Sequence, residues 1–134
     1  MKINSATSAQ IAASDASLST WLTANAGSGK TKVLIDRVAR LLLDGVQPEQ
    51  ILCLTYTKSA AVEMKNRLFD RLGKWAMLAD QDLNLSLFET GIQRKLSIAE
   101  LKKARTLFAR AIEAPGGLKI QTIHAFCASL LRKF

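Results

Sequence analysis

The sequence has 134 residues, 49% of them hydrophobic, and can therefore bury the core of one domain of ordinary size without disulfide or metal cross-links. Lys and Arg outnumber Asp and Glu by 19 to 11, a net charge of +8 that favours polyanionic partners such as nucleic acid or nucleotide phosphates, although scattered basic residues also fit a solvated surface without a partner. No apolar run approaches the roughly 20 residues that cross a bilayer, and the N-terminal stretch lacks the apolar core of a signal peptide, so we expect a soluble, cytoplasmic protein with no membrane partner.

The first half of the chain predicts a strand, a loop and a helix, followed by a second strand and helix. Residues 20–23 turn apolar and β-favouring after a small, polar stretch, and we expect a short buried strand there. After a glycine-containing loop at 24–31, apolar residues recur at helical spacing as far as Gly45, and Pro48 marks a turn. Residues 51–55 form the continuous apolar run of a buried parallel strand, and an amphipathic helix follows at once.

The middle of the chain contains a helix whose start is well marked. Residues 80–96 mix apolar and polar side chains in a pattern that fits a helix only loosely. Ser97, with Glu100 three residues later, has the form of a capping box. We therefore expect a helix that begins after Ser97 and ends before Pro115.

The last part of the chain predicts a third strand and a final helix. Residues 118–122 alternate as a strand, and residues 124–132 begin a helix with Phe126, Leu130 and Leu131 facing inward. Strands that alternate with helices in this way predict an α/β fold with a doubly wound parallel sheet.

Two cysteines bear on the chemistry of the interior. Cys53 and Cys127 are far apart in the sequence, and each stands in an apolar stretch, at 51–54 and 125–131. This placement suits reduced, buried thiols of a cytosolic protein. We expect neither a disulfide nor a metal site.

The strongest motif is the loop between the first predicted strand and helix. It matches the Walker A pattern from that pattern's second glycine onward, and its residues are Ala24, Asn25, Ala26, Gly27, Ser28, Gly29, Lys30 and Thr31. Gly27 and Gly29 let the backbone curl so that its N–H groups cradle the β-phosphate of ATP. Lys30 would bridge the β- and γ-phosphates, and the Thr31 hydroxyl would hold Mg²⁺, so these two are the candidate catalytic residues and Thr31 the candidate metal ligand. A chance glycine turn is the alternative, but a strand before and a helix after favour the nucleotide site.

The remainder of a hydrolytic site is missing from the sequence. P-loop enzymes hold Mg²⁺ with a carboxylate at the end of another strand. After Thr31, neither predicted strand ends in adjacent acids. The residues thus predict a nucleotide site without its hydrolytic half.

Over nearly its whole length, the chain resembles the UvrD/Rep-like superfamily 1 DNA helicases. Three segments carry the resemblance: residues 24–31, 55–64 and 122–127. The strongest likeness is to the N-terminal part of the AddA (RecB-like) subunits of helicase-nucleases, and an alanine at the position of Ala24 is common in that family. The resemblance implies that residues 1–134 are the N-terminal part of a UvrD-like ATP-binding domain, an incomplete P-loop NTPase (RecA-like) sheet that stops before Walker B. It also implies an ATP-dependent DNA helicase of double-strand break repair and recombination.

The resemblance also assigns a residue to the adenine base. In such helicases a glutamine upstream of the loop reads the adenine edge, and Gln10 is similarly placed. From the residues alone, Gln10 would be an exposed side chain, and Gln47 or Gln50 would be equal candidates.

A second segment resembles helicase motif Ia, which touches single-stranded DNA. Its residues are Thr55, Tyr56, Thr57 and Lys58, with Tyr56 where an aromatic is usual. Stacking of a base on an aromatic ring is worth about 1–3 kcal/mol in any sequence; a core tyrosine at a strand end is the alternative. Lys58 and Ser59 depart from the usual order of a polar amide followed by lysine, so the phosphate-contacting side chain stays open.

The third segment resembles motif Ib, which makes Thr122 and His124 candidates for contacts with the DNA backbone. A histidine at a strand-to-helix junction is otherwise a capping or packing residue.

These observations leave two functions open. The first is a helicase-nuclease whose parent protein hydrolyses ATP and works with a second, AddB-like subunit. The second is a fragment that binds ATP and single-stranded DNA without turnover, because the later helicase motifs have no counterpart here and we expect an N-terminal fragment or truncated gene product. A P-loop kinase or GTPase would need acceptor- or base-reading motifs that the sequence lacks.

Overall fold

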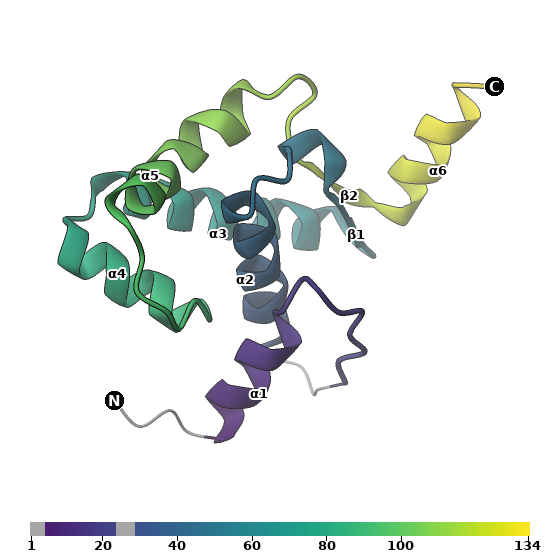
Figure 1. The fold of residues 1–134 in the computed structure, drawn as a ribbon. Helices are drawn as coiled ribbons and strands as arrows, with labels where there is room; N and C mark the ends of the chain where they lie inside the picture. Colours follow the sequence, from purple (N-terminus) through teal and green to yellow (C-terminus); the bar gives the residue numbers. More distant parts are fainter. Residues whose placement is uncertain (1–4, 24–28) are drawn as a thin grey trace.

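A computed structural model describes residues 5–23 and 29–134 of the chain, coloured in order in Figure 1. The helices are α1 (Ser5–Ala13), α2 (Lys30–Leu43), α3 (Lys58–Met77), α4 (Asp80–Glu89), α5 (Ile98–Glu113) and α6 (Ile123–Leu131), with a short 3-10 helix, η1 (Pro48–Gln50). The strands are β1 (Leu52–Thr55) and β2 (Lys119–Thr122). The described residues therefore form a helix-rich α/β unit, and the helices predicted after residues 31, 55, 97 and 122 are confirmed.

The two strands lie side by side and run parallel. Leu52 is opposite Lys119, and Thr55 is opposite Thr122. The chain between the strands passes through α3, α4 and α5 before it returns to the sheet (Figure 1). The predicted strands at 51–55 and 118–122 and their parallel pairing are confirmed. Because parallel strands end at the same edge, the residues that follow Thr55 and Thr122 are neighbours in space.

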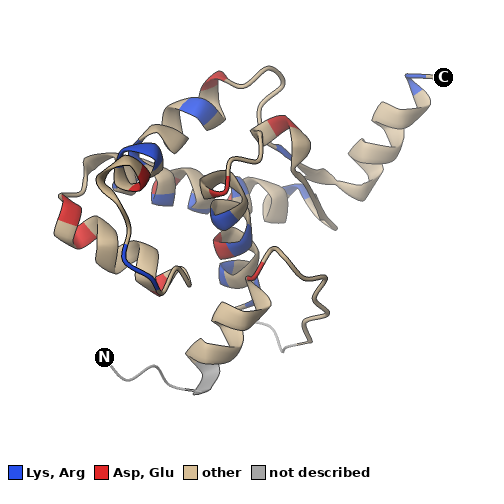
Figure 2. Ribbon diagram, viewed as in Figure 1, with Lys and Arg blue, Asp and Glu red and all other residues tan. Residues whose placement is uncertain are grey.

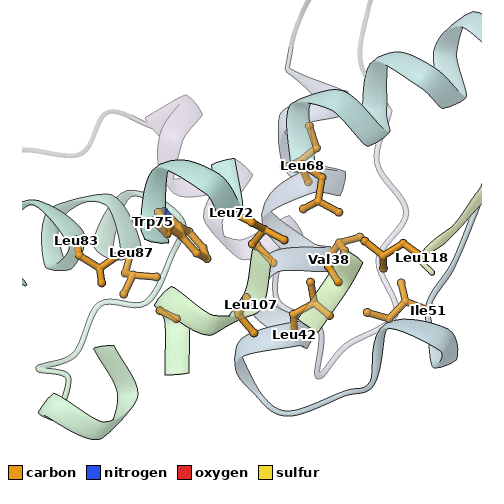
Figure 3. Close-up of a cluster of buried hydrophobic side chains, with 14 of the residues drawn as sticks. Val38, Leu42, Ile51, Leu68, Leu72, Trp75, Leu83, Leu87, Leu107 and Leu118 are labelled. Atoms are coloured by element: carbon orange, nitrogen blue, oxygen red, sulfur yellow. The ribbon is translucent and has the colours of Figure 1, made fainter. Parts of the chain in front are cut away.

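The core is built around α3, which packs against α5, α2 and both strands. Trp75 is fully buried and its indole N–H donates to Ser86 Oγ at 2.8 Å, so the ring's polar atom is satisfied. Figure 3 shows this cluster, in which the labelled side chains are Val38, Leu42, Ile51, Leu68, Leu72, Trp75, Leu83, Leu87, Leu107 and Leu118. Each large apolar side chain buried here contributes about 1.5–3 kcal/mol of transfer free energy. The core therefore fixes α3, whose N-terminus lies at the sheet edge.

The capping box predicted before α5 is present. Ser97 Oγ accepts the Glu100 backbone N–H at 3.2 Å, and the Glu100 carboxylate accepts the Ser97 N–H at 2.8 Å. The pKa of Glu100 is lowered to about 2. The largest cause is a hydrogen bond from the Arg94 guanidinium, and the second is the hydrogen bond from the Ser97 N–H. The helix start is therefore held by a carboxylate that is ionised at neutral pH.

The N-terminal part departs from the sequence-based expectation in two ways. Residues 20–23 form no strand, and Trp21 is 92% exposed, so the predicted short buried strand is wrong. A strand needs a neighbour that pairs with it, and the sheet of the described residues consists of β1 and β2 alone, so residues 20–23 have no pairing partner there. The helix α1 was not expected, because its small and polar residues have no apolar stripe that marks a helix.

The last helix, α6, projects from the end of the sheet (Figure 1) and contacts β1 and β2. None of its residues is buried: Leu131 is 77% exposed and Leu130 is 39% exposed, so the prediction that these leucines face inward is wrong. Cys127 is also exposed, which corrects its assignment as a buried thiol, whereas Cys53 on β1 is half-buried. The elements that α6 contacts most, β1 and β2, leave these leucines exposed. None of the described helices is both long and apolar enough to span a membrane.

The unequal exposure of the two thiols predicts unequal reactivity. Burial raises the pKa of the Cys53 thiol, so less thiolate is present to react. We expect a maleimide reagent to modify Cys127 at least about tenfold faster than Cys53 at neutral pH. Mass spectrometry of the chain during labelling measures both rates, and Cys127→Ser should remove the fast phase. Equal rates for the two sites would contradict the burial described here.

Candidate functional site

The start of α2 carries the described part of the predicted phosphate loop. Gly29 stands at the N-cap position with φ +92°, a left-handed conformation that favours glycine, and its carbonyl accepts the Val33 N–H at 3.1 Å. Lys30 and Thr31 are the first residues of α2; Lys30 is exposed and Thr31 is half-buried. The N–H groups of a first helical turn and the helix dipole attract anions. The remaining predicted loop residues lie outside the described residues: Ala24, Asn25, Ala26, Gly27 and Ser28.

The side chain of Gln10 lies against Gly29. A Cβ atom placed on Gly29 would overlap the Gln10 side-chain amide nitrogen, so glycine permits this close approach. The other two candidate glutamines lie at η1, beyond the C-terminal end of α2, where the Gln47 N–H donates to Gln50 Oε1 at 3.2 Å. Of the three, Gln10 is therefore the glutamine that the fold places at the loop.

The two segments predicted to touch DNA meet at one edge of the sheet. Thr55 and Thr122 are opposite each other in the parallel register, at the carboxyl ends of β1 and β2. Both strands are followed by helices, α3 and α6, whose N-termini therefore lie at this edge. Segments more than sixty residues apart thus form one surface, with two helix N-termini that favour phosphate groups.

The threonine hydroxyls at this edge are engaged within the protein. Thr57 Oγ1 accepts the Ala60 N–H and Thr122 Oγ1 accepts the Ala125 N–H, both at 3.1 Å, so these residues are the N-caps of α3 and α6. Thr55 Oγ1 donates to the Thr57 carbonyl at 3.0 Å. Capping is a role that threonine hydroxyls perform in many helices. Thr122, and not His124, is therefore the capping residue at the start of α6.

Three side chains at the same edge are open to solvent. Tyr56 is 86% exposed, which excludes the alternative of a core tyrosine. Lys58 and His124 are exposed at the first turns of α3 and α6. An exposed aromatic ring beside a lysine and a histidine can stack on a base and contact phosphate oxygens.

Charge is distributed unevenly over the molecule (Figure 2). Lys and Arg side chains are frequent on α2, α3 and α5, whereas Asp15 is the sole charged residue of the described stretch 5–23. Asp36 on α2 is 1% exposed and forms ion pairs with Lys32, at 2.6 Å, and with Arg71 on α3. This carboxylate is therefore committed to joining two helices and is not available to a metal ion.

Potential metal ligands are few in the part of the chain that the structure describes. Residues 5–23 and 29–134 contain no cluster of three His, Cys, Asp or Glu side chains that could hold a metal by themselves. Thr31, in the first turn of α2, can offer a hydroxyl oxygen of the kind that Mg²⁺ prefers. Magnesium takes few protein ligands when it is bound together with a nucleotide.

The family model of the UvrD/REP helicase N-terminal domain matches residues 4–134. The chain belongs to this family. It is 34% identical over 113 residues to the AddA subunit of the ATP-dependent helicase/nuclease of Lactobacillus acidophilus, and 36% identical over 113 residues to the corresponding protein of Enterococcus faecalis. It is 27% identical over 125 residues to the protein of the same name from Ligilactobacillus salivarius. The resemblance to UvrD/Rep-like helicases of the AddA type is confirmed.

The matches to these UvrD/Rep-family relatives cover very different shares of the two chains. The first match includes 84% of this chain and 8% of the Lactobacillus acidophilus protein, and the second includes 84% and 7%. The chain thus spans less than a tenth of the length of these curated relatives. No solved structure matches the chain.

Sequence reasoning missed the arginines that join α1 to α2. Arg37 and Arg40 donate hydrogen bonds to carbonyl groups at the end of α1 and in the segment after it. Arginine on a basic amphipathic helix gives no signal of such a role, because its backbone partners lie about 20 to 30 residues away in the sequence. The same holds for Asp36, whose partner Arg71 lies on another helix.

Proposed function

We propose that this chain is the ATP-binding, DNA-contacting segment of an ATP-dependent DNA helicase, of the helicase-nuclease type, that acts in double-strand break repair and recombination. The observation that carries the proposal is the parallel register of Thr55 with Thr122, which joins two helicase-like segments at one sheet edge. Membership of the UvrD/REP helicase N-terminal domain family supports it. The fold we propose is the first part of a RecA-like, P-loop sheet.

The nucleotide half of the proposal assigns a role to each loop residue. Backbone N–H groups of residues 24–29 and the first turn of α2 hold the phosphates, and Lys30 neutralises their charge. Thr31 and the phosphates hold Mg²⁺, which when bound stabilises the negative charge on the phosphate oxygens. The Gln10 amide, which lies against Gly29, offers a donor and an acceptor to the adenine edge. These contacts let the chain hold ATP at the beginning of α2.

The DNA half of the proposal uses the open side chains of the sheet edge. Tyr56 stacks on a base, while Lys58 and His124 contact the phosphate backbone together with the N-termini of α3 and α6. The starts of these helices are shaped by the hydroxyl groups of Thr55, Thr57 and Thr122. The same three residues present backbone N–H groups to the DNA strand. Contacts of this kind suit single-stranded DNA without sequence preference.

The name of the relatives describes one component of a helicase/nuclease made of several subunits, which extends the proposal to an assembly. We propose that the protein works with a second, AddB-like subunit, in the cytoplasm.

A second candidate function is binding without turnover. β1 is followed by Tyr56 and Thr57, and β2 by Ile123 and His124, so neither strand ends in adjacent acids. The one fully buried carboxylate on α2, Asp36, is paired with Lys32 and Arg71. ATP hydrolysis by this chain, stimulated by DNA, would rule out the binding-only function.

The DNA half is tested by binding of a fluorescent oligothymidine to Tyr56→Ala. Loss of one stacked base should weaken binding about five- to hundredfold, corresponding to about 1–3 kcal/mol. The logarithm of the affinity should fall linearly with the logarithm of salt concentration, and Lys58→Ala should reduce that slope by about one whereas Tyr56→Ala leaves it unchanged.

A matched control is Phe134→Ala, which removes another exposed aromatic ring. We expect it to bind DNA like the unaltered chain. An affinity that does not depend on salt, or equal effects of the Tyr56 and Phe134 substitutions, would contradict DNA contact at this edge.

A further inference from the structure

We propose that Arg37 and Arg40 on α2 are positioning residues for nucleotide recognition, because they tie the end of α1 to α2 and so hold Gln10 against Gly29. The inference rests on the proposed role of Gln10 at the adenine edge. It adds to that proposal the two side chains that place the glutamine.

The helix α1 cannot hold its position by local forces. It has nine residues, and isolated helices shorter than about 12–15 residues are marginal in water. It carries no acidic residue in its first turn and no basic residue in its last, so no charge of its own compensates its dipole. Its orientation must therefore come from contacts with the rest of the protein.

Arg37 supplies the first set of these contacts. Its Nη1 donates to the carbonyl oxygens of Ala13 at 3.3 Å and Asp15 at 2.7 Å. Its Nη2 donates to the carbonyl of Leu18 at 2.6 Å. The last carbonyls of a helix have no partner within the helix, and a cation beside them also offsets the helix dipole. One guanidinium thus caps α1 and fixes the segment that follows it.

Arg40, one turn later on α2, supplies the second set. Its Nη1 donates to the Ile11 carbonyl at 3.1 Å and to Ser14 Oγ at 2.9 Å. Ser14 is fully buried, and its hydroxyl donates in turn to the Ile11 carbonyl at 2.8 Å. A buried network in which every polar group has a partner holds its members rigidly.

The turn after α4 closes over this network. Gly91 has φ +113°, and a Cβ atom there would lie 2.8 Å from Arg40 Nη1 and 3.2 Å from Ile11 Cγ2. The glycine therefore lets the turn pack directly on Arg40 and α1. Segments from three parts of the chain meet at the end of α1.

These contacts reach Gln10 through the backbone. Ile11 follows Gln10 directly, and the Ser14 N–H donates to the Gln10 carbonyl at 3.0 Å. The Gln10 side chain meets Gly29, which immediately precedes α2. One helix, α2, thus carries Lys30 at its start and, within about three turns, the arginines that place the glutamine. The base-reading and phosphate-binding groups are held as one unit.

The test compares ATP with GTP binding, in the presence of Mg²⁺, for the chain and for Gln10→Ala, Arg37→Met and the double variant. Gln10→Ala should reduce the preference for ATP over GTP about five- to tenfold, the value of one hydrogen-bonded contact. Arg37→Met should reduce it by a similar factor, with a much smaller change in affinity for inorganic triphosphate. Because Arg37 acts through Gln10, the double variant should lose no more preference than either single variant.

The matched control is Arg110→Met, an arginine on α5 whose side chain donates to Gln47 at 3.4 Å. It should keep the ATP preference. Arg37→Lys, which can still donate to a carbonyl of this segment, should recover part of it. If Arg37→Met loses its helical circular dichroism, the test moves to Arg40→Met and Ser14→Ala, which remove only the second set of contacts. These variants should lose a smaller part of the preference for ATP over GTP.

The outcomes separate the two proposals. An unaltered chain that binds ATP and GTP equally would overturn the adenine role of Gln10. A chain that prefers ATP, loses this preference in Gln10→Ala and keeps it in folded Arg37→Met and Arg40→Met would overturn the positioning role alone. Additive losses in the double variant would also overturn it, because they would mean that Arg37 acts independently of Gln10.

Discussion

Lys30→Ala should weaken ATP binding about ten- to hundredfold while the chain stays folded. Lys30 is exposed at the first position of α2, so its removal leaves the core intact. A charge-assisted hydrogen bond to phosphate contributes about 1.5–3 kcal/mol, which corresponds to that loss of affinity. Titration calorimetry with ATP and Mg²⁺ measures the change.

The specificity of this effect is tested with another exposed lysine, on a different helix. Lys102→Ala removes the same charge from the surface of α5 and should bind ATP like the unaltered chain. Binding of oligothymidine should be nearly unchanged in Lys30→Ala, because the DNA edge lies at the ends of β1 and β2. Equal ATP affinity of the two lysine variants would exclude a phosphate site at the start of α2.

The second large effect concerns stability. Arg71→Met should lower the free energy of unfolding by about 3 kcal/mol, the lower end of the range for breaking a buried ion pair, because Lys32 remains beside Asp36. Asp36 is 1% exposed, and its partners come from its own helix and from α3. Without Arg71, half of the compensation for a buried carboxylate is lost. Urea denaturation followed by circular dichroism measures the difference.

Arg67→Met is the control for this experiment. Arg67 stands one turn earlier on α3 and pairs with Glu63 at 2.7 Å, with both side chains more than half exposed. Exposed pairs contribute about 0–1 kcal/mol, so this variant should be close to the unaltered chain. The double variant Asp36→Leu with Arg71→Met should be more stable than Arg71→Met alone, since it removes the stranded charge. Equal losses of unfolding free energy in Arg71→Met and Arg67→Met would contradict a buried ion pair between Arg71 and Asp36.

The N-terminal part shows where sequence patterns reach their limit. Residues 20–23 have strand-forming side chains, yet a strand exists only where another strand pairs with it, and among the described residues they pair with neither β1 nor β2. The helix α1 has no apolar stripe, and its order comes from arginines more than twenty residues later. In α6 the apolar face was recognisable, but its exposure depends on what packs beside it.

The sequence by itself determined the features that depend on neighbouring residues. The Walker A spacing that ends at Lys30 and Thr31, the apolar runs that became β1 and β2, and the capping box at Ser97 all follow from short-range chemistry and periodicity. The family could be recognised for the same reason, since its motifs are short and ordered.

Only the tertiary structure decided which distant residues meet. It placed Gln10 rather than Gln47 or Gln50 beside Gly29, and it set Thr55 opposite Thr122. These arrangements are absent from any local pattern, because they depend on how α1 is held by backbone-directed hydrogen bonds and on how strands separated by three helices pair in register.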